Sequence, residues 1–114
     1  MSEPIHTQSL RNQAALQELK SLLVKKYPEQ IEQLILFGSQ TDGTAREYSD
    51  YDLLLILSTP YDWRFENGIY DTCSEINVKY DIITDVKIIS RQELHTLRGK
   101  QPYIQHALHN GIQL

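Results

Sequence analysis

LILFGSQTDGTAREYSDYDLLLIL, residues 34–57, joins two short apolar runs through a polar segment rich in turn-forming residues. Short apolar runs that are bounded by Gly, Asp and Ser are typical of buried strands. We therefore expect one strand over 31–37 and a second over 49–57. Beyond Asp52 the second run is apolar at every position, which predicts a central strand covered on both faces. The segment between the runs predicts a loop with a tight turn at Asp42–Gly43.

Helical patterns surround these two strands. Apolar residues spaced by three and four predict an amphipathic helix over 9–27, and near-helical spacing predicts another over 61–78. KYDIIT, residues 79–84, predicts a third strand, with a continuation through Val86 as the alternative. The last predicted elements are a short helix opened by the S-x-x-E pattern at 90–93 and a helix from Pro102 to a stop at Gly111. This order predicts a single α/β (α+β) domain over residues 1–114 with a small sheet.

Composition excludes several classes of function. The chain has 11 Lys and Arg against 15 Asp and Glu, a formal net charge of −4. That balance argues against bulk contacts with the phosphates of DNA or RNA, but it allows a local site for one phosphorylated molecule. No apolar run approaches the roughly 20 residues that span a bilayer, and the N-terminus lacks the pattern of a secretory signal. The single cysteine, Cys73, is predicted to be a core thiol, and its lack of a disulfide partner favours the cytoplasm.

Two carboxylates open the second strand. Asp50 and Asp52 stand two positions apart on one strand face, with Cα atoms about 6.6 Å apart. Leu54 and Ile56 continue that face, so the acids lie at the edge of the core, where like charges repel unless a cation lies between them. Carboxylate oxygens select hard cations such as Mg²⁺, Mn²⁺ or Ca²⁺. The alternative is a pair of exposed acids without a ligand.

A third carboxylate would complete a two-metal site. Asp81 is the first candidate, because it lies inside an otherwise apolar predicted strand where an unpaired charge is costly. Asp85 shares its predicted face and is the second candidate. In this scheme Asp50 and Asp52 bind two Mg²⁺ ions. Asp81 binds one of them and is the general base for attack of a hydroxyl on an α-phosphorus.

Gly38 and Ser39 end the first predicted strand. Glycine has no Cβ, so a phosphate can approach the backbone there. The amides of Ser39 and Gln40, with the Ser39 hydroxyl, could hold phosphate oxygens. Arg46, in the same loop, is a candidate phosphate contact, with a solvated arginine as the equal alternative. Gly-Ser alone is common, but together with Asp-x-Asp it predicts phosphates on one side of the site and metal ions on the other.

The combined pattern resembles the signature of minimal nucleotidyltransferases of the DNA polymerase beta superfamily. That signature is a hydrophobic strand, Gly-Ser, ten residues, Asp-x-Asp and a second hydrophobic strand, and this chain carries each part in order. The resemblance implies a small mixed sheet flanked by helices and Mg²⁺-dependent transfer of a nucleoside monophosphate from ATP or another NTP. It also implies a site at Gly38, Ser39, Asp50, Asp52 and Asp81.

The resemblance extends to partners. Small stand-alone members are often encoded beside a helical protein with a higher-eukaryote-and-prokaryote nucleotide-binding (HEPN) domain, and such pairs behave as toxin–antitoxin modules. There the small protein can neutralise an RNase partner by adenylylating it. We expect a partner protein or a second copy of the chain to complete the acceptor site. Transfer to a small-molecule hydroxyl, such as that of an aminoglycoside, and a non-catalytic antitoxin or interaction module are the alternatives.

Overall fold

The structure is a computed structural model that describes residues 4–38 and 50–114, with side chains from residue 13 onward. The chain forms helices and strands in an order close to the expected one. They are α1 (Pro4–Lys26), β1 (Ile31–Phe37), β2 (Tyr51–Leu57), α3 (Trp63–Tyr80), β3 (Thr84–Ser90), the 3₁₀ turns η1 (Gln92–His95) and η2 (Arg98–Lys100), α4 (Pro102–Asn110) and β4 (Ile112–Gln113). No helix among the described residues is long and apolar enough to cross a membrane.

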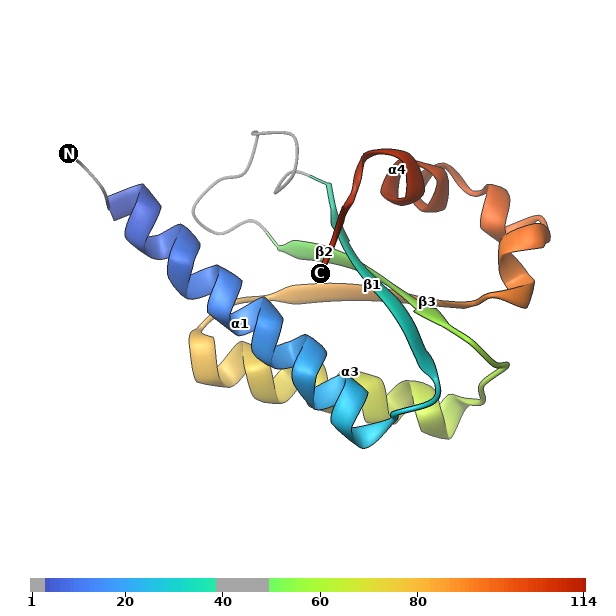
Figure 1. Ribbon diagram of the computed structural model, residues 1–114, viewed down its shortest axis with the longest axis horizontal. Helices are drawn as coiled ribbons and strands as arrows, with labels where there is room; N and C mark the ends of the chain where they lie inside the picture. Colours follow the sequence, from blue (N-terminus) through green and yellow to red (C-terminus); the bar gives the residue numbers. More distant parts are fainter. Residues whose placement is uncertain (1–3, 39–49) are drawn as a thin grey trace.

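The sheet has the strand order β3-β2-β1-β4 and mixed direction. β1 pairs antiparallel with β2 and with β4, whereas β2 and β3 are parallel and are connected through α3. Helices α1 and α3 cover one face of the sheet, and α4 lies on the other (Figure 1). The predicted fold class, a small mixed sheet flanked by helices, is confirmed.

Strand β2 holds the two layers of the core together. Its alternate side chains pack into different clusters, because successive residues of a strand point to opposite faces. One cluster lies under α1 and α3 and contains Tyr51, Leu53, Leu55 and Leu57. The other lies under α4 and contains Leu54 and Ile56. The prediction of a central strand buried on both sides is therefore confirmed.

The predicted third strand is present, but its predicted bounds of 79–84 are wrong. Helix α3 continues to Tyr80, and Asp81 caps it in the left-handed conformation at φ 55°. The strand begins only at Thr84 and runs to Ser90. The two isoleucines of KYDIIT suggested a buried strand, but they belong to the link between helix and strand. A parallel partner for β2 requires a crossover of this kind, and α3 with its link supplies it.

The C-terminal elements follow the predicted capping signals. The Glu93 amide donates to Ser90 Oγ at 3.2 Å, and the Ser90 amide donates to Glu93 Oε1 at 3.0 Å. This reciprocal pair is the predicted capping box, although the helix that follows it is only a 3₁₀ turn. Pro102 begins α4, and Gly111 caps its end. The C-terminal signals therefore predicted both boundaries of α4.

Candidate functional site

Two carboxylates lie side by side on neighbouring strands. Asp52 of β2 is paired with Asp85 of β3 in the parallel ladder. Neighbouring strands are about 4.8 Å apart, and paired residues project from the same face of the sheet. Further along, that face carries Leu54 and packs against α4. Asp50 immediately precedes β2 and is exposed. The register thus brings Asp52 and Asp85 together at one end of the α4 face.

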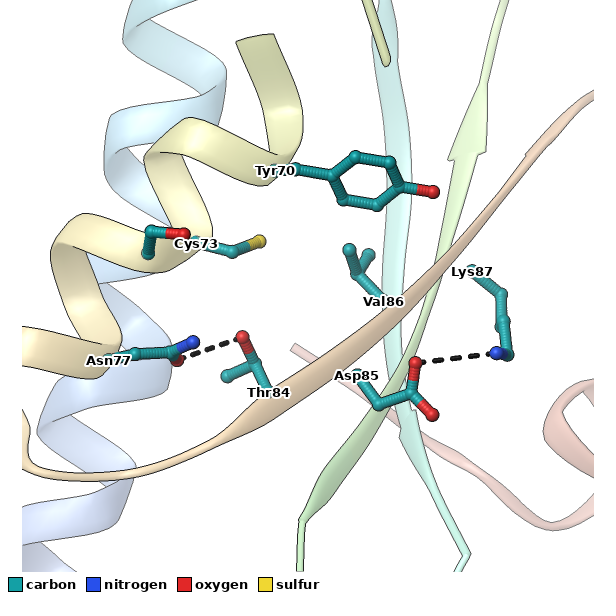
Figure 2. A pocket seen from close by; sticks show the side chains of 8 residues that line it. Tyr70, Cys73, Asn77, Thr84, Asp85, Val86 and Lys87 are labelled. Carbon is teal, nitrogen blue, oxygen red and sulfur yellow. Dashed lines mark hydrogen bonds and ion pairs between the residues drawn. The ribbon is translucent and has the colours of Figure 1, made fainter. Parts of the chain in front are cut away.

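The charges around Asp52 oppose its ionisation. Burial raises the pKa of Asp52 above its ordinary value, and the negative charges of Asp85 and Asp50 raise it further. Lys87 acts in the opposite direction. Its Nζ lies 3.3 Å from Asp85 Oδ1, as Figure 2 shows. Among the described residues, three carboxylates are therefore balanced by one ammonium group, and a bound divalent cation would relieve the repulsion between them.

Gly38 lies against the Asp52 carboxylate. Phe37, the last residue of β1, is paired with Asp52 in the antiparallel ladder. Gly38 follows with φ 81°, and a Cβ on it would run into the Asp52 carboxyl group. The structure thus brings Gly38, at the end of the first strand, together with Asp52 of the Asp-x-Asp motif. Ser39, Arg46 and the expected turn at 42–43 lie outside the described residues.

Gly38→Ala should damage both stability and the site. A left-handed φ costs an L-residue about 1–2 kcal/mol, and the new methyl group would displace the Asp52 carboxylate. Urea unfolding should show that loss of stability, and the increase of melting temperature caused by Mg²⁺ and ATP should shrink. A variant as stable and as responsive as the wild type would show that the Gly38 backbone does not touch Asp52.

Asp81 lies in a different place from its predicted one. It is an exposed helix cap, three residues before β3 begins, and not a residue inside a strand. Asp85, the second candidate, is the acid that β3 pairs with Asp52. Lys87 was not recognised as a site residue from the sequence. The alternation of polar Asp85 and Lys87 with apolar Val86 was the signal that could have identified both the strand and its polar face.

The donor chemistry suits a hard cation that is shared with a substrate. Among the described residues, no group of three His, Cys, Asp or Glu side chains is arranged to hold a metal ion by itself. Mg²⁺ usually binds one or two carboxylates together with waters and substrate phosphates, not an all-protein cage. The paired carboxylates of Asp52 and Asp85 match that mode of binding.

Cys73 is buried in α3, as predicted, with 4% of its surface exposed. Burial raises the pKa of the Cys73 thiol to about 11. A rise of two units leaves about 100-fold less thiolate near pH 8, and thiolate is the reactive form. We expect a thiol reagent at pH 8 to react at least about 100-fold more slowly with the folded protein than with the urea-unfolded chain. Equal rates would contradict the buried placement.

Comparisons with known proteins identify the family of the chain. The sequence model of the family described as "Polymerase beta, Nucleotidyltransferase" matches residues 17–113. A Methanocaldococcus jannaschii protein named "Putative protein adenylyltransferase" is 26% identical over 102 residues, which cover 90% of this chain and 96% of that protein.

Solved structures share the fold. A toxin–antitoxin structure with AMP-PNP matches with a TM-score of 0.55 and 19% identity, over 84% of this chain and 69% of that one. A complex of tri-AMPylated Shewanella oneidensis HEPN toxin with MNT antitoxin matches with a TM-score of 0.52 and 20% identity, over 89% and 69%. The family match covers most of the sequence, and the chain therefore belongs to the polymerase beta nucleotidyltransferases.

Proposed function

We propose that this nucleotidyltransferase moves AMP from Mg²⁺-bound ATP to a hydroxyl group of a partner protein. The observation that carries the proposal is the pair Asp52 and Asp85, held in register on parallel strands, with the Asp52 carboxylate packed against Gly38. The similar Methanocaldococcus jannaschii protein is named as a protein adenylyltransferase, and one structure of the same fold contains a tri-AMPylated toxin with its antitoxin. Both descriptions favour a protein acceptor and AMP as the transferred group.

The proposed reaction breaks a phosphoanhydride bond of ATP and forms a phosphodiester bond to the acceptor. The acceptor oxygen bonds to the α-phosphorus of ATP, the bond from that phosphorus to the bridging oxygen breaks, and pyrophosphate leaves. Asp85 accepts the hydroxyl proton, while Asp50 and Asp52 provide the remaining carboxylates. A bound Mg²⁺ would neutralise phosphate charge and orient the substrate. Ser39 and Arg46 are proposed to contact the phosphates beside Gly38.

The proposed partner is a helical protein of the HEPN class. The names of the similar toxin–antitoxin complexes favour that choice over a small-molecule acceptor. We propose the cytoplasm as the location of this chain, because the proposed reaction requires ATP.

The first test measures binding and transfer in separate assays. At a concentration about 100 times its Kd, Mg²⁺-bound ATP should stabilise the folded protein by about 2.7 kcal/mol, seen as a higher melting temperature. With α-³²P-labelled ATP, label should pass to the protein encoded beside this chain, and EDTA should abolish the transfer. Label on an added aminoglycoside instead would favour the small-molecule alternative. Binding of ATP without any transfer would favour an interaction module.

A further inference from the structure

β3 forms one edge of the sheet, and its main-chain groups alternate between the two sides of the strand. The Tyr51 amide donates to the Ile83 carbonyl at 2.8 Å, and the Arg91 amide donates to the Leu57 carbonyl at 2.7 Å. In a parallel ladder these two bonds imply that the main-chain amides and carbonyls of residues 85, 87 and 89 point toward β2. The peptide groups of Thr84, Val86 and Ile88 therefore face away from the sheet.

The two halves of this edge differ. At the C-terminal half, the Ile88 carbonyl accepts hydrogen bonds from the Tyr61 hydroxyl at 3.0 Å and from Arg98 at 2.8 Å. These contacts occupy the outward carbonyl of Ile88, so another strand cannot pair with this half of the edge. At the N-terminal half, no hydrogen bond from the described residues reaches the outward amide or carbonyl of Val86. Only this half of the edge can accept a further strand.

A groove runs along the open half. Its floor is the edge over residues 84–87, and its wall is the side of α3 that carries Tyr70 and Asn77 (Figure 2). Ser74 also lines this wall. The groove has a volume of about 370 Å³. Tyr70 has 40% of its surface exposed and offers an aromatic contact. Asp85 lines this groove and is also the acid that the ladder pairs with Asp52.

We propose that the acceptor protein of the proposed reaction inserts an extended segment into this groove and pairs with β3 as an additional strand. Paired residues on neighbouring strands have Cβ atoms about 4.5–5.5 Å apart and share a face. A Ser, Thr or Tyr opposite Asp85 therefore projects to the carboxylate face. Its oxygen bonds to the α-phosphorus as pyrophosphate leaves, and its proton passes to Asp85.

The same pairing accounts for how other residues of the segment are bound. Neighbours of the hydroxyl-bearing residue project to the opposite face, toward Tyr70 and Asn77. Main-chain hydrogen bonds to Val86 would hold the segment in register and orient the acceptor hydroxyl. This proposal rests on protein adenylylation as the function, and it requires an extended acceptor segment.

The first test places a large side chain in the groove by a substitution on α3. Ser74 is exposed on the groove wall, so Ser74→Trp should leave the core intact and block the segment. Transfer of ³²P-AMP to the neighbouring-gene protein should fall at least about tenfold, while the melting-temperature rise with Mg²⁺ and ATP stays as in the wild type. Val78→Trp is the matched control, because Val78 is 84% exposed on the same helix and does not line the groove. Its transfer should equal that of the wild type.

The second test examines strand pairing itself. Mass spectrometry would identify the labelled residue, and synthetic peptides spanning it would carry N-methyl groups on alternate amides. Strand pairing predicts that one alternate set of methyl groups blocks transfer and that the other set does not, because successive amides of a strand point to opposite sides. Equal effects of both sets would overturn the proposal.

The outcomes separate the two proposals. If the wild type labels no protein, protein adenylylation fails and the docking proposal falls with it. If the wild type and Ser74→Trp label the partner equally, only the docking proposal fails. If Ser74→Trp removes the response to Mg²⁺ and ATP, the groove holds the nucleotide and not the acceptor, which also overturns the docking proposal.

Discussion

Asp52→Asn is expected to make the free protein melt at a higher temperature and to reduce nucleotidyl transfer by about 100- to 1,000-fold. Asparagine keeps the shape of the side chain and removes its charge. In the folded state, burial and the charges of Asp85 and Asp50 disfavour that charge. The substitution therefore removes a repulsion that the wild type tolerates, together with a carboxylate that the proposed cation requires.

The sign of the pH dependence follows from the raised pKa of Asp52. Between its ordinary value of 3.8 and the raised value, the folded protein binds more protons at this residue than the unfolded chain does. Stability from this group is thus lost as pH rises through that interval, and the penalty is complete above it. The stabilisation by Asp52→Asn should be largest near neutral pH and should vanish as the pH falls below 3.8.

Addition of Mg²⁺ and ATP should reverse the order of the melting temperatures, so that the wild type melts above Asp52→Asn. The wild type should gain stability by mass action, whereas Asp52→Asn should gain little. Thermal melts with and without the ligand give both comparisons in one experiment. Asp71→Asn is a suitable control, because Asp71 is an exposed acid on α3 and does not shift the pKa of Asp52. An Asp52→Asn variant that responds to Mg²⁺ and ATP like the wild type would contradict the proposed site.

The centre of the fold and half of the site could be predicted from local sequence. The unbroken apolar run after Asp52 predicted burial on both faces of β2, and the structure confirms it. Gly38 and Asp52 could be assigned to one site from the sequence because each lies at the end of an apolar run facing the same polar segment; their contact follows from the antiparallel pairing of β1 with β2. Both features depend on residues close together in the sequence.

The third acid depends on register, which local patterns specify poorly. The helix α3 ends only where Asp81 takes a left-handed conformation, and Asp is one of the few residues that adopt it readily. That displacement of the helix end by a few residues changes which acid reaches the sheet. Ile83, read as part of a strand, is 56% exposed in the link. After the crossover through α3, β3 pairs with β2 in the register that places Asp85 beside Asp52.

Separate substitution of Asp85 and Asp81 by asparagine tests which of the two acids is the general base. We expect Asp85→Asn to lower transfer by at least about 100-fold, because Asp85 is the carboxylate paired with Asp52. Asp81→Asn should keep activity within about threefold of the wild type, because asparagine also tolerates the left-handed cap.

A pH profile separates a base from a residue that only supports the fold. If Asp85 accepts the proton, the residual activity of Asp85→Asn should lose the acidic limb of the wild-type profile, while Asp81→Asn should keep it. Melting temperatures identify any variant that is merely unstable. The opposite result, with Asp81→Asn inactive and Asp85→Asn active, would return the role to Asp81. That result would mean that the β2–β3 register, which pairs Asp85 with Asp52, does not identify the general base.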